Sequence, residues 1–142
     1  HVDGGAPLLF CGDTLFSAGC GRLFEGTPAQ MHASLSKLAE LPGATRVCCT
    51  HEYTLSNLRF ALAAEPDNVD TQTYQAWCLQ ERAAGRPTLP STVARERAAN
   101  PSWGCEQPAL SAAAQQHGAQ GAAARDAVST LAALREWKNR YQ

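Results

Sequence analysis

The order of two short apolar runs around one capped helix limits the folds open to this chain more than any other feature. Residues 6–11 and 45–49 have the length and composition of β-strands, and the first run is apolar throughout, so we expect it to be buried on both faces. Between them, Thr27 and Gln30 form a capping box, and Pro28 suits the first helical turn. This order predicts one unit of a parallel sheet. Because two strands are not stable alone, we expect a larger sheet and a chain that is truncated before its first strand.

A polar side chain follows each predicted strand, which places Asp13 and His51 at the same edge of the sheet. By itself, Gly12-Asp13 after a strand is most often a turn, and a single histidine is more often a surface residue than a ligand. Together the two side chains are candidate metal ligands, since carboxylate oxygen and imidazole nitrogen are common donors. The residues alone leave both interpretations open.

A glycine-rich loop follows Asp13 and carries a single cation. Glycines stand at positions 19, 21 and 26, and Arg22 lies among them. A carboxylate at a strand end beside such a loop indicates a site for a metal ion and an anionic ligand.

The second half of the chain has the pattern of helices. Apolar residues recur at helical spacing, and proline and glycine interrupt the pattern. We place a boundary near residue 54, with residues 1–53 as one domain and residues 54–142 as an all-helical domain. Residues 115–124, rich in Ala, Gln and Gly, predict a loop. The predicted helices cover residues 54–64, 69–84, a short segment from a cap at Ser91 to Ala99, 108–116 and 126–141.

The composition excludes several classes of function. The 142 residues carry a net charge of −1, which provides no overall field toward nucleic acid or an anionic membrane. No apolar run reaches the ~20 residues of a membrane span. Six cysteines at positions 11, 20, 48, 49, 78 and 105 include no Cys-x-x-Cys pair, which argues against a zinc finger or a disulfide framework. Buried free thiols predict a reducing compartment, and we expect a cytoplasmic monomer.

Several short motifs follow one another along nearly the whole chain. They are Gly-Asp-Thr-Leu-Phe at 12–16, Gly-Cys-Gly-Arg at 19–22, Phe-Glu-Gly-Thr at 24–27, His-Glu-Tyr-Thr at 51–54, Pro-Thr-Leu-Pro-Ser-Thr at 87–92, Asn-Pro at 100–101 and Leu-Arg-Glu-Trp-Lys at 134–138. This combination resembles hydroxyacylglutathione hydrolase (glyoxalase II), a family of the metallo-β-lactamase superfamily.

The resemblance implies an α/β fold: part of a metallo-β-lactamase αβ sandwich, truncated at its N-terminus, followed by an all-helical substrate-binding domain. It implies an enzyme that hydrolyses the thioester S-D-lactoylglutathione to D-lactate and glutathione in methylglyoxal detoxification. It also implies two divalent metal ions, zinc or zinc mixed with iron or manganese, which polarise the thioester carbonyl and provide a hydroxide near neutral pH. By the same resemblance, Asp13 corresponds to a ligand that bridges the metals. His51 corresponds to a terminal ligand that also faces the substrate.

The resemblance alone assigns further residues to substrate binding. Arg22 and Tyr53 correspond to residues that contact the glutathione tripeptide. Phe24 stands where some members have a tyrosine, so a hydroxyl contact is lost there. Arg135 and Lys138 correspond to a basic pair on the last helix, and their spacing of three places both on one face. Without the resemblance, two cations near a helix C-terminus are more simply explained as partners of the helix dipole.

One part of the family pattern is absent from these residues. Neither His-x-His-x-Asp-His nor Gly-His-Thr-x-Gly-His occurs in the sequence. Asp13 and His51 are too few ligands for two metal ions, so we expect the chain as given to be incomplete and inactive alone. Two alternatives remain: a module that binds glutathione conjugates without catalysis, and a truncated product without function.

Overall fold

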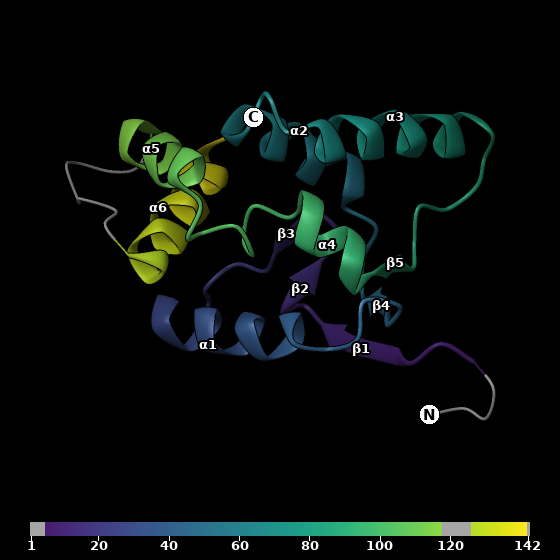
Figure 1. The fold of residues 1–142 in the computed structure, drawn as a ribbon, viewed down its shortest axis with the longest axis horizontal. Helices are drawn as coiled ribbons and strands as arrows, with labels where there is room; N and C mark the ends of the chain where they lie inside the picture. The colour runs from purple at the N-terminus through teal and green to yellow at the C-terminus, as the bar shows by residue number, and fades with distance from the viewer. Residues whose placement is uncertain (1–4, 118–125, 142) are drawn as a thin grey trace.

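The computed structural model describes residues 5–117 and 126–141, which form a mixed α/β structure (Figure 1). Of the loop predicted at residues 115–124, residues 115–117 are helical, contrary to the prediction, and the rest lies outside these ranges. The described elements, in chain order, are β1 (Leu8–Gly12), β2 (Leu15–Phe16), β3 (Gly19–Cys20), α1 (Pro28–Ala39), β4 (Arg46–Cys49), α2 (Thr54–Ala64), α3 (Val69–Ala83), β5 (Ser91–Thr92), α4 (Val93–Ala99), α5 (Pro108–His117) and α6 (Ala127–Arg140).

The sheet has the predicted parallel pair, with one additional strand. The order is β1-β4-β5, in which β4 runs parallel to β1 and antiparallel to β5. Strand β5 departs from the all-helical second half that we predicted, because Ser91 and Thr92 pair with Val47 and Arg46 just before α4 begins. A chain segment beyond residue 54 therefore completes the sheet in the described part of the molecule.

The expectation that the first strand is buried on both faces is wrong. Phe10 is 77% exposed and Leu8 is 42% exposed, whereas Leu9 and Cys11 pack against the core. The reason is that β1 packs against the core through only one face, so alternate side chains along the strand are exposed. An apolar run alone does not distinguish this arrangement from a strand covered on both sides.

The segment predicted as a glycine-rich loop contains a small antiparallel hairpin, β2–β3. Its residues from Leu15 to Gly21 are buried, and Ala18 at the turn adopts a positive φ of 57°. In Figure 1 the hairpin lies beside α4 near the middle of the molecule, with α2 and α3 along one side and α1 and β1 along the other. Helix α6 packs against both α5 and α1.

Helix α1 begins as the sequence predicts. The Thr27 side chain accepts a hydrogen bond from the Gln30 amide, and the Gln30 side chain accepts one from the Thr27 amide. These two bonds satisfy amides that the first helical turn leaves without partners.

Replacing Thr27 by alanine should therefore lower the free energy of unfolding by about 1 kcal/mol, because the Gln30 amide loses its acceptor. Thermal denaturation measures the change. The matched control is Thr73→Ala, which removes an exposed threonine from the interior of α3 and should have almost no effect. An equal effect of both variants would contradict the capping argument.

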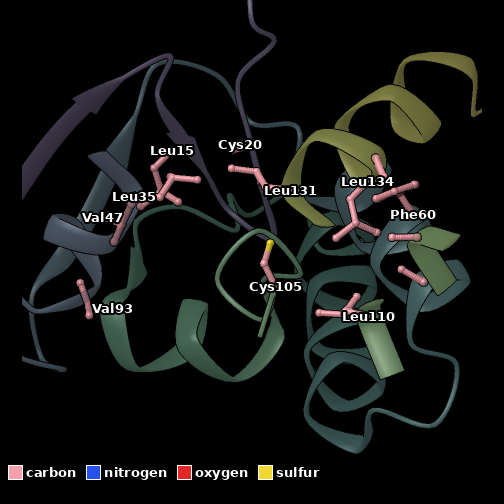
Figure 2. Close-up of a cluster of buried hydrophobic side chains, with 13 residues drawn as sticks. Leu15, Cys20, Leu35, Val47, Phe60, Val93, Cys105, Leu110, Leu131 and Leu134 are labelled. Carbon is pink, nitrogen blue, oxygen red and sulfur yellow. The ribbon is translucent and has the colours of Figure 1, made fainter. Parts of the chain in front are cut away.

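One apolar cluster joins the two halves of the chain (Figure 2). Leu15, Leu35 and Val47 come from before residue 54, and Leu110 and Leu131 come from after it. A second, smaller cluster surrounds the hairpin turn and α3, and contains Ala18, Leu58, Tyr74, Cys78 and Ala99. The division into domains 1–53 and 54–142 stays a prediction, but the core itself does not stop at that boundary.

All six cysteines are free thiols, as predicted, but only Cys20, Cys78 and Cys105 are buried, whereas Cys11, Cys48 and Cys49 are partly exposed. Among the described residues, no helix is both long and apolar enough to pass through a bilayer.

Candidate functional site

A cavity of about 520 Å³ opens between the hairpin, α2 and α6. The size suits a ligand larger than a single amino acid. All of the residues predicted as metal ligands or substrate contacts line it: Asp13, Arg22, Phe24, His51, Tyr53, Arg135 and Lys138. The structure thus brings these residues together, while the role of each stays a prediction.

Strand pairing brings Asp13 and His51 to one rim of this cavity. Gly12 is paired with Cys49, and the Thr50 amide donates to the Gly12 carbonyl at 3.4 Å. The Thr50 hydroxyl also donates to the Asp13 carboxylate. Parallel strands that end at the same level therefore deliver both side chains to one edge.

Aromatic rings surround His51. Its ring stacks on Tyr53 with centroids 5.2 Å apart, and Phe16 lies 6.5 Å from it on the buried side. Phe16 also contacts Tyr53 at 5.1 Å. These contacts limit the orientations of the imidazole and leave the side chain exposed at the cavity rim.

The donors present do not complete a metal site. Within residues 5–117 and 126–141, no group of three or more His, Cys, Asp or Glu side chains is placed to hold an ion. Asp13 and His51 provide two donors, whereas even a single tetrahedral site needs more.

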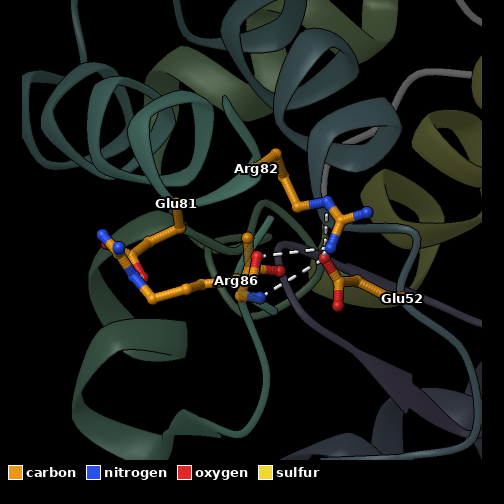
Figure 3. A network of polar contacts seen from close by, with 5 residues as sticks. Glu52, Glu81, Arg82 and Arg86 are labelled. Carbon is orange, nitrogen blue, oxygen red and sulfur yellow. Dashed lines mark hydrogen bonds and ion pairs between the residues drawn. The ribbon is translucent and has the colours of Figure 1, made fainter. Parts of the chain in front are cut away.

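Glu52, the neighbour of His51, is not a further donor because it points to α3 (Figure 3). Its carboxylate lies 3.5 Å from Arg82 and accepts a hydrogen bond from the Thr88 amide at 3.3 Å. Half of the Arg82 side chain is exposed, so this ion pair is weak, whereas the hydrogen bond from Thr88 attaches the connector before β5.

Arg135 is a buried cation in the wall of the cavity, with 8% of its surface exposed. It lies on α6, whose first turn is capped by Asp126. The Arg135 guanidinium donates to the Cys20 carbonyl at 2.8 Å, and to the Asn139 side chain at 2.9 and 3.3 Å. Because a guanidinium has five N–H donors, these three bonds leave donors for a ligand.

Lys138 lies one turn further along the same helix. Its ammonium donates to the Asn57 side chain and lies 5.6 Å from the centre of the Phe60 ring. Asn57 in turn donates to the Ser17 carbonyl at 2.9 Å. Burial, and then the positive charge of Arg135, lower the pKa of Lys138 to about 8.

The cations around the cavity have no carboxylate partner in the described part of the chain. The ion pairs found there are Arg82–Glu52 and Arg86–Glu81, and neither includes Arg22, Arg135 or Lys138. Against these three cations, the cavity wall contains one acidic side chain, Asp13. The arrangement is suited to an anionic ligand that carries carboxylates.

Sequence reasoning missed Asn57, Phe60 and Phe16 as parts of the cavity. Asn57 gave a signal that could have been used, because it is a polar residue beside Leu58 on the buried side of α2. The two phenylalanines gave no signal of a position in the cavity wall, since aromatic residues in apolar runs are most often core residues.

Comparisons with known proteins identify the family of this chain. The family described as "Hydroxyacylglutathione hydrolase C-terminus" matches residues 52–141. The hydroxyacylglutathione hydrolase of Albidiferax ferrireducens is 59% identical over 137 residues, which cover 96% of this chain and 52% of that protein. That of Cupriavidus taiwanensis is 57% identical over 136 residues, or 96% of this chain and 50% of the relative. That of Nitrosomonas eutropha is 51% identical over 138 residues, which cover 97% of this chain and 53% of the relative.

The chain spans about half the length of the curated relatives that it matches. The family match nevertheless covers more than half of the chain itself, and it includes Tyr53, Arg135 and Lys138 of the cavity wall. This chain therefore belongs to the hydroxyacylglutathione hydrolase family.

Proposed function

We propose that this chain provides the glutathione-binding part of an enzyme that hydrolyses S-D-lactoylglutathione to D-lactate and glutathione. The observation that carries the proposal is the group of three cations, Arg22, Arg135 and Lys138, which line one cavity without an ion-pair partner among the described residues. The glutathione moiety carries two carboxylates, which need cations or amide donors. The relatives are named for a hydroxyacylglutathione substrate, and this supports the same ligand class here.

The proposed contacts follow from the chemistry of each side chain. Arg135 and Lys138 lie one turn apart on α6 and can share one carboxylate of the tripeptide. Arg22, exposed on the loop after β3, can reach a second carboxylate. Tyr53 offers a hydroxyl donor at the same wall, and Phe24 offers apolar area and backbone groups.

For the reaction itself we propose two divalent metal ions, zinc or zinc mixed with iron or manganese, with Asp13 and His51 as two of the ligands. Such ions polarise a carbonyl and make bound water acidic. The described residues alone do not provide enough donors for such a site.

The wider architecture is part of the same proposal. We place β1 and β4 in the sheet of a metallo-β-lactamase-type sandwich, which the exposed outer side of β1 supports. The ligand is a small molecule, and the protein acts as a cytoplasmic monomer.

Calorimetry with glutathione and an assay with S-D-lactoylglutathione and added zinc test the function. We expect the purified chain to bind glutathione and not to turn over the thioester at the rate of a full-length relative. Absence of glutathione binding by the folded chain would refute the binding role. Turnover equal to that of a full-length relative would contradict the expectation that the chain alone is inactive.

The affinity for S-methylglutathione, a thioether that lacks the titrating thiol, should fall by about 10-fold between about pH 7 and about pH 9.5. The pKa of Lys138 is lowered to about 8, so its ammonium is charged below that pH and attracts the carboxylate, and it becomes neutral above it. The groups that face it are Arg135, Cys20 and the uncharged Asn57 and Phe60. Calorimetric titrations across this range measure the change.

The matched control for this pH dependence is Lys138→Arg, because a guanidinium stays charged throughout the range. The variant should lose most of the decline, and whatever decline remains belongs to the ligand's own amino group. An identical decline in both proteins would exclude Lys138 as its source.

A further inference from the structure

A buried carboxylate binds the hairpin turn and is not part of the cavity wall. Glu96 of α4 is 1% exposed, and four donors surround it. One oxygen accepts from the hydroxyls of Ser17, at 2.8 Å, and Ser91. The other accepts from the Ala18 amide at 2.8 Å and the Asn100 side chain at 2.9 Å. Each carboxylate oxygen thus accepts two hydrogen bonds, which is close to the largest number that it can accept.

Glu96 holds the hairpin turn in a conformation that the turn residue rarely adopts. Ala18 has a φ of 57°, in the left-handed region that residues with a Cβ usually avoid. Its amide is bound by Glu96, and its methyl group is packed fully in the cluster with Leu58 and Tyr74. Ser17, the other turn residue, is bound by Glu96 and by the Tyr74 hydroxyl at 2.7 Å.

The carbonyls of the same hairpin are bound by side chains from other elements. Asn100 donates to the carbonyls of Phe16 and Gly19 at 3.2 and 3.0 Å. The Ser17 carbonyl accepts from Asn57, and the Cys20 carbonyl accepts from Arg135. Of these donors, Asn57 and Arg135 line the cavity.

The backbone at Gly19 transmits any displacement of the turn directly to the cavity. A Cβ at this position would lie 2.9 Å from Asn57 and 3.1 Å from the Lys138 ammonium. The Gly19 backbone thus passes so close to these two side chains that no side chain would fit between them, and a displacement of the turn changes the surroundings of both.

We propose that Glu96 is a positioning residue for the cavity: by holding the Ser17–Ala18 turn, it sets the places of Asn57, Arg135 and Lys138, which receive the anionic ligand. The identity of that ligand rests on the proposed function. The link from Glu96 to these three side chains is a property of the ligand-free chain and can be measured without any ligand.

Three variants of the full chain test the proposal. Glu96→Ala removes all four hydrogen bonds. Glu96→Gln keeps an oxygen for the Ala18 amide and Asn100, while its NH₂ group can donate to the two serine hydroxyls, which are able to accept. Val93→Ala is the matched control, because Val93 is a fully buried residue of the same helix that packs in the main cluster and makes no hydrogen bond to the turn.

The first readout is the affinity for S-methylglutathione. Glu96→Ala should bind about 10-fold more weakly, because its cations are displaced from their places. Glu96→Gln should stay within about 3-fold of the native chain, since the amide group can keep a hydrogen bond to each of the four partners. Val93→Ala should lose stability and keep the native affinity. Native affinity in a folded Glu96→Ala variant, or an equal loss in Val93→Ala, would overturn the proposal.

The second readout needs no ligand and separates this proposal from the proposed function. In Glu96→Ala, amide exchange at Ala18 should accelerate, and the NMR signals of the Asn57 amide and the Arg135 Nε–H should shift. Unchanged signals would overturn the positioning role even if the ligand binds. Shifted signals in a chain that does not bind S-methylglutathione would support the positioning role and refute the proposed function.

If Glu96→Ala does not fold, a second variant tests the proposal. Ser17→Ala removes one of the hydroxyls that bind Glu96, and it should give the same shifts with smaller size. Absence of these shifts would overturn the proposal.

Discussion

Replacing Arg135 by alanine is expected to weaken glutathione binding by about 30-fold, which corresponds to about 2 kcal/mol. Arg135 is 8% exposed, so its interaction with a carboxylate is formed in a largely water-free wall. Calorimetric titration of the variant with glutathione measures the loss.

The same change should also lower the free energy of unfolding by about 2 kcal/mol, because the buried Cys20 carbonyl loses its donor. Chemical denaturation measures this second effect. Since both effects come from one side chain, binding must be compared at a temperature at which the variant is fully folded.

The matched control is Arg140→Ala. Arg140 lies on the same helix and is exposed, and it donates to the His117 carbonyl at 3.1 Å, outside the cavity wall. It should change stability by less than about 0.5 kcal/mol and leave affinity unaltered. If Arg140→Ala weakens binding as much as Arg135→Ala, the effect is one of general charge, and the assignment of Arg135 to the ligand is wrong.

Replacing Gly21 by alanine should be the most damaging single methyl addition near the site. A Cβ there would lie 2.0 Å from the Asp13 carbonyl oxygen, and the Gly21 amide already donates to the Thr14 carbonyl at 3.1 Å. The two backbone segments must separate, at a cost of about 3 kcal/mol in the free energy of unfolding. Denaturation curves of native and variant chains measure this cost.

Gly85→Ala is the control for backbone conformation. Gly85 has a φ of +71°, and no described atom lies within 4 Å of where its Cβ would stand. This variant should lose about 1 kcal/mol from the left-handed conformation alone. Equal losses in the two variants would mean that the contact between Gly21 and Asp13 relaxes easily, contrary to the tight packing described here.

The sequence was sufficient where side-chain periodicity determines the element. Helix α2 occupies residues 54–64 as predicted, and α1 has the predicted capping box, because both depend on residues a few positions apart. The hairpin β2–β3 was not predictable in this way. Its strands have two residues each, and they are held by Asn57, Glu96, Asn100 and Arg135, which come from distant parts of the chain.

For the site, the sequence indicated which side chains follow strand ends, but it did not indicate which polar side chains are buried. Asp13 and His51 could be placed at one edge because parallel strands end together. Glu96 could not be recognised, because one glutamate in the charged segment of α4 has the pattern of a solvent-facing residue. Only the converging donors, which no local pattern contains, show that it is buried.

The apolar cluster that includes Leu15 and Val47 from the first part of the chain and Leu110 and Leu131 from the last has a consequence for how the molecule melts. If either part loses its packing, the other loses contacts too, so we expect the described regions to unfold as one cooperative unit. Calorimetry should accordingly record a single endotherm, with equal calorimetric and van't Hoff enthalpies. We would then expect neither half of the chain, prepared alone on one side of residue 54, to give a folding transition of its own.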